Sequence, residues 1–246
     1  MLGYITYGDG PRRPEMGERQ ILGGRFITLG MNGSAHPRGP LALRRAAVGA
    51  RRLREAGVRA AVFPVDFPYM AVFLRQGIVP VDTLPLRRAL AAPLTRRRLE
   101  EMGLSPTEAV VAVSGERAGR ELAETAKALA ISFRYVLLSV GSGGEEFART
   151  LRREYGISLL LKPSVEQLDR ADALLLFSPR GDLAGENAIF YALYPGGEAG
   201  QGRLPLPLPA ALAEQVEPNC GGEQLAAALY AMGALRLETI LAEIPC

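Results

Sequence analysis

The sequence predicts an α/β protein: a doubly wound, mostly parallel sheet in the C-terminal part, preceded by a smaller α/β N-terminal domain. Two observations predict this class. From residue 40 onward the apolar runs are short and uniformly apolar, and they alternate with longer runs of helical periodicity. Apolar runs separated by helices are typical of strands buried on both faces of a parallel sheet. Right-handed crossovers between such strands produce the doubly wound arrangement.

The first 40 residues are rich in glycine and proline. The runs LGYITY and GRFITLG are predicted as short strands, joined by the polar loop GDGPRRPEMGERQI. The two strands could pair with each other or extend a sheet edge, in this subunit or in another. The sequence leaves these alternatives open.

The alternation then continues through three helices and two strands. A helix over 41–57 follows Pro40 and ends at Gly57. The strands VRAAVFP and IVPV flank the short helix FPYMAVFLRQG, and the long helical run TLPLRRALAAPLTRRRLEEMG comes next. We expect this last helix to break at Pro93, because proline lacks the amide hydrogen that a helix interior uses.

The second half repeats the pattern more regularly. Strands are predicted at 110–113 and in FRYVLLSV, ISLLL and DALLLFSP, and helices in RAGRELAETAKALA, EEFARTLRREYG and SVEQLDRA. NAIFYALYPGG is a helix or a strand, GRLPLPLPAAL an extended connection, GEQLAAALYAMG a helix, and ALRLETILAEI a strand or a helix. The break near Gly103 to Ser105 predicts a basic N-terminal domain over 1–105 and a second domain over 106–246.

Charge and composition restrict the function classes. Residues 1–107 carry 17 basic and 8 acidic side chains, and residues 108–246 carry 12 basic and 18 acidic ones. This asymmetry fits a small anionic partner, or a homo-oligomer that forms through oppositely charged halves. Nothing in the sequence interleaves arginine with aromatic residues as base-stacking proteins do, so nucleic-acid binding is not expected. Two cysteines and one histidine are too few for a zinc site, and we expect no metal.

No apolar run approaches the roughly 18 residues that span a membrane. The N-terminus also lacks the basic-then-apolar pattern of a signal peptide. We therefore expect a cytoplasmic protein with no membrane partner.

Two strand-to-helix turns are candidate nucleotide loops. In the first, VAVSGERAGRELAETAKAL, the frame of a dinucleotide loop falls on Ser114, Glu116 and Gly119. Residues 109–180 resemble the Rossmann-like NAD(P)-binding domain of the shikimate dehydrogenase and glutamyl-tRNA reductase type. The resemblance implies a dinucleotide site at Ser114, Gly115 and Gly119, with Gly119 for close helix–strand packing. Two of the three loop glycines are absent, so the loop disfavours NAD(P), and the cofactor stays unknown.

The second turn is SVGSGGEEFARTL. With the run before it, it resembles motif I of the class I methyltransferases, which bind S-adenosylmethionine, although Ser139 and Glu145 depart from that motif. Its position one unit after the first strand indicates a second-strand loop. The residues Gly141, Ser142, Gly143 and Gly144 are then either a sharp turn or a set of amides that binds an anion.

The same resemblance excludes specific chemistries. Shikimate dehydrogenases use a lysine and an aspartate ahead of the dinucleotide domain, but the first half of this chain contains no lysine. Glutamyl-tRNA reductases use a cysteine nucleophile in that region, and no cysteine precedes Cys220. Neither activity is expected here.

Three other residue types are candidates for chemistry. Asp66 and Asp82 each follow a strand and precede a helix, so they are either N-caps or a pair of catalytic carboxylates at one sheet edge. His36 is expected to be a solvated loop residue. Cys220, at a helix N-terminus, is a weak candidate nucleophile, and Cys246 is the last residue.

The function expected from these observations is an atypical small-molecule or nucleotide-binding module, or a non-catalytic one, with a degenerate dinucleotide loop. The alternatives are an atypical NAD(P)-dependent oxidoreductase, an S-adenosylmethionine-dependent methyltransferase and a structural assembly module. The sequence leans against an enzyme.

Overall fold

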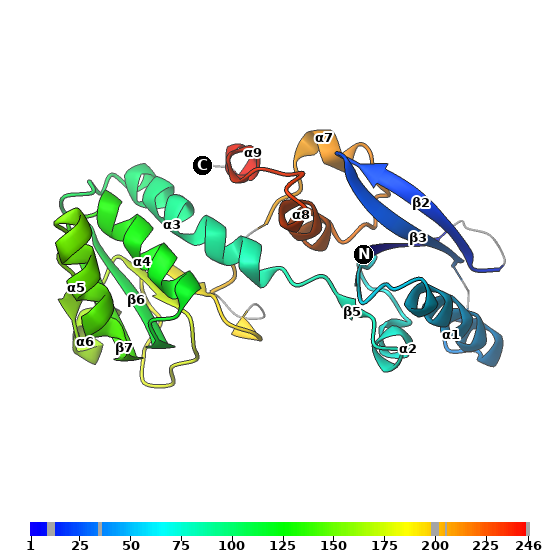
Figure 1. Cartoon of the computed structure of the whole chain (residues 1–246), viewed down its shortest axis with the longest axis horizontal. Coiled ribbons are helices and arrows are strands. Elements are labelled where there is room, and N and C mark those ends of the chain that lie inside the picture. Colours follow the sequence, from blue (N-terminus) through cyan, green and yellow to red (C-terminus); the bar gives the residue numbers. More distant parts are fainter. Residues whose placement is uncertain (9–12, 34–35, 198–201, 205, 245–246) are drawn as a thin grey trace. The chain divides into compact units, whose positions relative to one another are not determined.

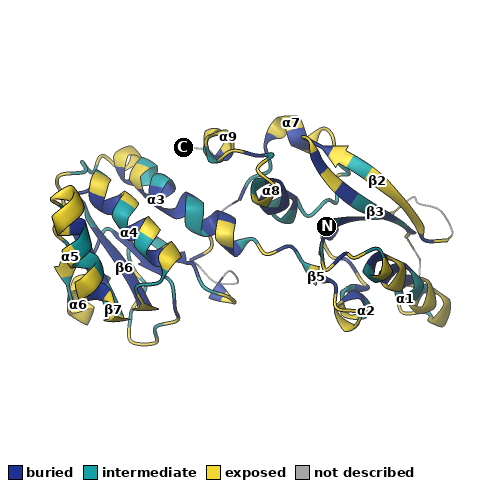
Figure 2. Cartoon of the chain, viewed as in Figure 1, coloured by how far each residue is buried: buried dark blue, intermediate teal, exposed yellow. Residues whose placement is uncertain are grey.

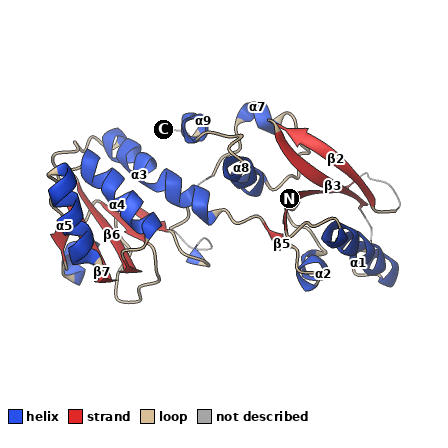
Figure 3. Ribbon diagram, viewed as in Figure 1, coloured by secondary structure: helices blue, strands red, loops and turns tan. Residues whose placement is uncertain are grey.

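The computed structural model describes residues 1–8, 13–33, 36–197, 202–204 and 206–244. They form two compact units: unit 1 contains Met1–Thr83 and Leu206–Ile244, and unit 2 contains Leu84–Pro205. Each unit has a five-stranded sheet and its own helices (Figures 1 and 3). Both sheets are mostly parallel, which confirms the predicted α/β class.

The first three strands of unit 1 lie in the glycine-rich segment at the start of the chain. Its strands are β1 (Leu2–Gly8), β2 (Glu15–Ile21), β3 (Gly24–Asn32), β4 (Ala60–Val62) and β5 (Val79–Pro80), and they lie in the order β2-β3-β1-β4-β5. The predicted strands β1 and β3 pair with each other in parallel, which resolves the alternatives that the sequence left open. Its helices are α1 (Pro40–Glu55), α2 (Met70–Arg75), α7 (Ala210–Ala213), α8 (Gly222–Ala231) and α9 (Leu237–Glu243).

β2 lies in the segment that was expected to be a polar loop. Six of its seven residues are not buried, and it pairs antiparallel with β3 as an edge strand (Figure 2). The loop prediction was wrong here, because an edge strand is held by backbone hydrogen bonds and needs no apolar pattern of its own.

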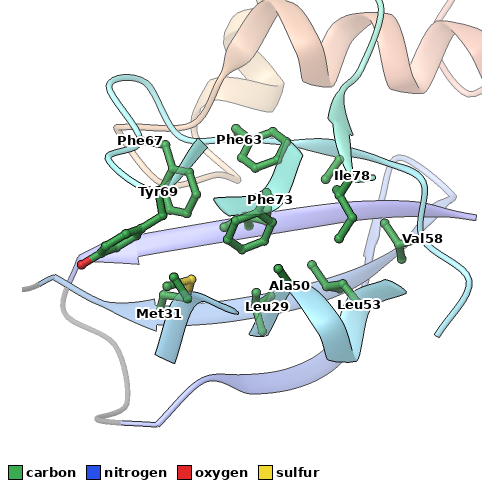
Figure 4. Packing of buried hydrophobic residues seen from close by; sticks show 13 residues of the cluster. Leu29, Met31, Ala50, Leu53, Val58, Phe63, Phe67, Tyr69, Phe73 and Ile78 are labelled. Atoms are coloured by element: carbon green, nitrogen blue, oxygen red, sulfur yellow. The ribbon is translucent and has the colours of Figure 1, made fainter. Parts of the chain in front are cut away.

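The core of unit 1 lies between its sheet and the helices α1 and α2. Leu29 and Met31 of β3 face Ala50 and Leu53 of α1 (Figure 4). Phe63, Phe67, Tyr69 and Phe73 pack edge to face or tilted, with ring centroids 5.3–5.6 Å apart. Such aromatic pairs contribute about 0.5–1.5 kcal/mol each beyond the area they bury.

The C-terminal segment returns to unit 1 and belongs to its core. The amide of Phe63 donates to Gln224 Oε1 at 2.9 Å, and Asn219 Nδ2 donates to the carbonyl of Tyr7 at 2.7 Å. A Cβ on Gly221 would lie 2.3 Å from the carbonyl oxygen of Phe63, so only glycine permits this close approach. The observed division therefore differs from domains 1–105 and 106–246, since residues 206–244 belong with the first unit.

Unit 2 is a doubly wound, Rossmann-like sheet. Its strands are β6 (Val110–Arg117), β7 (Tyr135–Ser142), β8 (Leu160–Leu161), β9 (Ala173–Leu176) and β10 (Ile189–Ala192). Their order, β10-β9-β6-β7-β8, is all parallel, and it corresponds to the order 3-2-1-4-5 of dinucleotide-binding sheets. The chain order reverses between β6 and β9, which is the switch point of the fold.

The helices of unit 2 are α3 (Leu84–Glu101), α4 (Arg120–Ser132), α5 (Gly144–Tyr155) and α6 (Val165–Asp169). Helix α3 was expected in the N-terminal domain but packs in unit 2. Arg87 is buried and donates to the carbonyl of Leu204, and Arg88 donates to the carbonyl of Leu193. The expected break at Pro93 is not observed, since α3 continues through it.

Among the described residues, no helix is long and apolar enough to cross a membrane.

Candidate functional site

The first candidate loop is largely strand. Ser114 and Gly115 lie inside β6, where Ser114 pairs with Ser139 on one side and with Leu176 on the other. Helix α4 begins only at Arg120, with Gly119 as its N-cap. The residues that should form a tight phosphate-binding turn are therefore extended, and Ser114 is completely buried. The loop lacks the geometry of the dinucleotide fingerprint.

The glycines at this edge are explained by packing. A Cβ on Gly115 would lie 2.6 Å from Leu122 Cδ1, and one on Gly141 would lie 2.9 Å from the carbonyl oxygen of Glu116. A Cβ on Gly144 would lie 2.5 Å from Val140 Cγ2. Gly119 was expected to permit close helix–strand packing, but a Cβ added at Gly119 would meet no atom within 4 Å. That expectation was wrong, and Gly115 contacts the helix instead.

The two candidate loops are joined by backbone pairing. Arg117 at the end of β6 pairs with Ser142 at the end of β7, and the amide of Ala118 donates to the carbonyl of Ser142 at 2.9 Å. Gly143 then adopts a left-handed conformation, with φ +76°, and caps α5. This is the sharp turn that the sequence left as one of two alternatives, and only a residue such as glycine adopts it without strain.

A cavity of about 480 Å³ lies beside this turn, over the carboxyl ends of β7 and β8. The backbone from Gly141 to Gly144 forms one side. The other lining residues are the apolar Leu138, Val140 and Leu161 and the charged Glu145, Glu146, Arg149 and Lys162. The candidate residues Gly141, Ser142, Gly143 and Gly144 are thus brought together, whereas Ser114, Gly115 and Gly119 are not part of the lining.

The charges of the cavity balance. Lys162 Nζ donates to Glu145 Oε1 at 2.7 Å, and this pair lowers the pKa of Glu145 and raises that of Lys162. Glu146 and Arg149 supply one further charge of each sign. The cavity therefore offers both donors and acceptors, together with apolar walls, and it does not have the excess of positive charge that a polyanion requires.

A residue that sequence reasoning missed lies over the neighbouring strands. Arg180 Nη1 donates to Ser114 Oγ at 3.2 Å and to Ser139 Oγ at 3.1 Å, so its guanidinium lies over the C-terminal halves of β6 and β7. Its other edge pairs with the carboxylate of Asp182. The run FSPRGD after a buried strand was a usable signal, because charged residues at the carboxyl edge of a parallel sheet lie where ligands bind.

Asp66 and Asp82 follow the adjacent parallel strands β4 and β5, so the fold places both at the carboxyl edge of the sheet in unit 1. Both are exposed. The N-cap prediction was wrong for Asp66, since α2 begins four residues later with Tyr69 as its cap, and Asp66 is left-handed with φ +56°. Asp82 lies two residues before α3. Their role as a catalytic pair stays a prediction.

Cys220 does not fit the nucleophile prediction. Gly221, not Cys220, is the N-cap of α8, and burial raises the pKa of the Cys220 thiol. The thiol lies near Tyr4, whose hydroxyl donates to Glu217 Oε2 at 2.5 Å, while Arg19 donates to Glu217 Oε1 at 2.8 Å. This network ties the C-terminal segment to the sheet. His36 is exposed, and Cys246 lies outside the described residues.

No group of histidine, cysteine and carboxylate residues in the described part of the chain is arranged to hold a metal ion. No protein-family model matches the chain. No curated protein matches it either.

Solved structures show similarity in fold. The D-lactate dehydrogenase with NAD+ from Lactobacillus jensenii has 14% identity and a TM-score of 0.28, over 58% of this chain and 48% of that one. The A chain of dipicolinate synthase from Bacillus subtilis has 18% identity and a TM-score of 0.36, over 75% of this chain and 66% of that one. A shikimate 5-dehydrogenase-like protein has 15% identity and a TM-score of 0.28, over 100% of this chain and 93% of that one.

This chain spans 48% of the lactate dehydrogenase and 60% of the catalytic subunit of aspartate transcarbamoylase from M. jannaschii. At such low identities these are likenesses in fold, and no activity follows from them.

Proposed function

We propose that unit 2 is an atypical small-molecule-binding module that takes a nucleoside, or a ligand of similar chemistry with at most one negative charge, in the cavity over β7 and β8. The observation that carries this proposal is the cavity itself. Its volume of about 480 Å³ lies within the range of roughly 300–1,000 Å³ that ligand sites occupy. Its position at the carboxyl ends of parallel strands is where doubly wound sheets bind ligands.

The lining supports this ligand chemistry. Leu138, Val140 and Leu161 provide apolar contact for a ring. The carboxylates of Glu145 and Glu146 can accept hydrogen bonds from hydroxyl groups, as an acidic residue near a second strand does for ribose. The balanced charge disfavours a diphosphate, and the extended β6 turn offers none of the amides that would hold one. Hydride transfer with NAD(P) is therefore not part of the proposal.

A thermal-shift series tests the proposal, because a ligand that binds only the folded state raises the unfolding midpoint. Adenosine at about ten times its dissociation constant should add about 1.4 kcal/mol and raise the midpoint by roughly 3–6 °C. NADH, NADPH and S-adenosylmethionine are the comparison ligands. A shift with NADPH alone would favour the oxidoreductase, and a shift with S-adenosylmethionine alone would favour the methyltransferase.

A pair of matched variants localises the binding. Ser142→Phe places a ring at the cavity lining and should remove the adenosine shift. Ser158→Phe introduces the same ring at an exposed position outside that lining and should preserve it. Equal shifts in both variants would show that the cavity is not the site. The absence of any shift in the unmodified protein, together with a stable oligomer in light scattering, would favour the assembly module.

A further inference from the structure

Arg180, in the loop after β9, is held over β6 and β7 of unit 2 by two serine hydroxyls. Its Nη1 donates to Oγ of both Ser114 and Ser139, which lie inside the neighbouring strands β6 and β7, three residues before each strand ends. Ser114 has no exposed surface, and the Arg180 side chain is only 25% exposed. The two serines thus fix one edge of a planar guanidinium whose orientation a lysine could not reproduce.

Asp182 occupies the opposite edge of the same guanidinium. Arg180 Nε donates to Asp182 Oδ1 at 2.7 Å, and Nη2 donates to Oδ2 at 2.5 Å. This two-bond fork is the arrangement with which arginine recognises a carboxylate ligand. Asp182 itself is 51% exposed, so its carboxylate closes the site from the solvent side.

The loop that carries Asp182 is anchored beyond it. The amide of Ala184 donates to Asp169 Oδ1 at 2.9 Å, and Asn187 Nδ2 donates to the carbonyls of Leu168 and Ala171 at 2.8 Å. The loop is held before Asp182 by Arg180 and after Asp182 by the bonds of Ala184 and Asn187. The Asp182 carboxylate can therefore move off the guanidinium by rotation of its own side chain. The rest of the loop need not move.

From this geometry we propose that Arg180 is a binding site for the carboxylate of a small organic acid, and that Asp182 is an internal competitor that occupies the site when the acid is absent. The site is independent of the nucleoside cavity, since neither Arg180 nor Asp182 belongs to its lining. The exchange replaces one carboxylate with another on the same guanidinium, so no covalent bond changes and no proton is transferred. Arg180 and Asp182 stabilise each other's charged forms, which raises the pKa of Arg180 and lowers that of Asp182.

Removal of the competitor tests the proposal. With acetate as the probe, the backbone amide signals of Ser114, Ser139 and Gly181 are followed by NMR in the full chain. Asp182→Asn keeps the shape of the side chain but removes its charge, and it should lower the apparent dissociation constant for acetate by about tenfold or more. Asp182→Ala should act in the same direction. Glu186→Gln, at an exposed carboxylate on the same loop, is the matched control and should leave acetate affinity unchanged.

The arginine variant supplies the decisive comparison. Arg180→Lys in the Asp182→Asn background should abolish saturable acetate binding, because the ammonium group cannot form the fork. Equal acetate affinity with and without Asp182, or with and without Arg180, would overturn the proposal and leave a structural ion pair. Saturation by inorganic phosphate but not by acetate would overturn the assignment to a carboxylate. Ser142→Phe should leave the acetate response intact, so a failure of the nucleoside proposal is distinguishable from a failure of this one.

Discussion

Single glycines at the edge of unit 2 have roles that the sequence motif did not indicate. The motif assigned Gly119 to close packing and the cluster from Gly141 to Gly144 to a turn or an anion site. Only the turn at Gly143 has the left-handed backbone of a required glycine, while Gly141 is needed because a backbone oxygen of β6 lies too close for a side chain. The sequence reveals where glycines gather, but it does not show that the atom excluding a Cβ at Gly141 belongs to Glu116 of another strand.

Substitution of Gly141 tests this account. Gly141→Ala should destabilise unit 2 by about 1–3 kcal/mol, because its Cβ would lie 2.9 Å from a backbone oxygen that has little freedom to move. Gly119→Ala, with open space around the Cβ and φ −71°, should change stability by less than about 1 kcal/mol. Hydrogen exchange of the β6 and β7 amides measures both. Equal protection in the two variants would contradict the packing role.

Glu217 gives unit 1 a sensitivity to acid. Burial alone would raise its pKa, but the hydrogen bonds from Tyr4 and Arg19 act in the opposite direction, and the net pKa is lowered. A lowered folded pKa means that the stabilisation is complete above the ordinary value of 4.5 and is lost as the pH falls through the lower folded value.

As the pH falls below 4.5, the free energy of unfolding of unit 1 should decrease more steeply in the unmodified chain than in Glu217→Gln. Denaturant unfolding at a series of pH values measures it, with hydrogen exchange of the β1 and β3 amides as the local probe. Parallel pH profiles for the two proteins would show that Glu217 does not contribute.

Among the secondary-structure elements, those with a buried apolar face were predicted well, and those without one were not. The predicted strands in FRYVLLSV and DALLLFSP correspond to β7 and β9, because β7 contains the buried apolar run 136–138 and β9 is buried and apolar throughout. β2 was missed because its stability comes from backbone pairing with β3. The ambiguous run NAIFYALYPGG contains β10, whose identity depends on pairing with β9 rather than on its own pattern. Arg180 was missed because its hydrogen bonds to Ser114 and Ser139, inside two other strands, are tertiary contacts.

Helix α3 supplies a prediction about its buried arginine. Arg87→Met should destabilise unit 2 by roughly 2–3 kcal/mol, because it removes a buried side chain whose Nη1 donates to the carbonyl of Leu204 at 2.8 Å and leaves that carbonyl without this donor. Arg96→Ala on the same helix is the control. Arg96 is exposed and pairs with Glu100 one turn later, so its loss should cost less than about 1 kcal/mol. Equal unfolding midpoints for the two variants would refute the role of Arg87.

The charge asymmetry between the two halves of the sequence does not carry over to the two compact units of the structure. By sequence, the two halves are oppositely charged, but the two compact units are not. Unit 1 carries 13 basic and 11 acidic side chains, and unit 2 carries 16 and 15. The difference arises because the acidic C-terminal segment returns to unit 1 and the arginine-rich helix α3 belongs to unit 2. Assembly through oppositely charged halves stays a prediction, and these units do not supply opposite charges for it.

The division of the chain is the property of the whole molecule that sequence pattern predicted least well, and it can be tested with fragments. A fragment of residues 84–205 retains α3, all five strands of its sheet and the partners of Arg87 and Arg88. It should fold alone and unfold cooperatively. A fragment of residues 106–246 lacks α3, and its C-terminal segment loses Tyr7 and Phe63, to which Asn219 and Gln224 hydrogen-bond, so it should be less stable or aggregate. Circular dichroism during urea unfolding compares the two. A cooperative transition in the 106–246 fragment, with none in 84–205, would restore the boundary near residue 105 and reject the return of the C-terminal segment to unit 1.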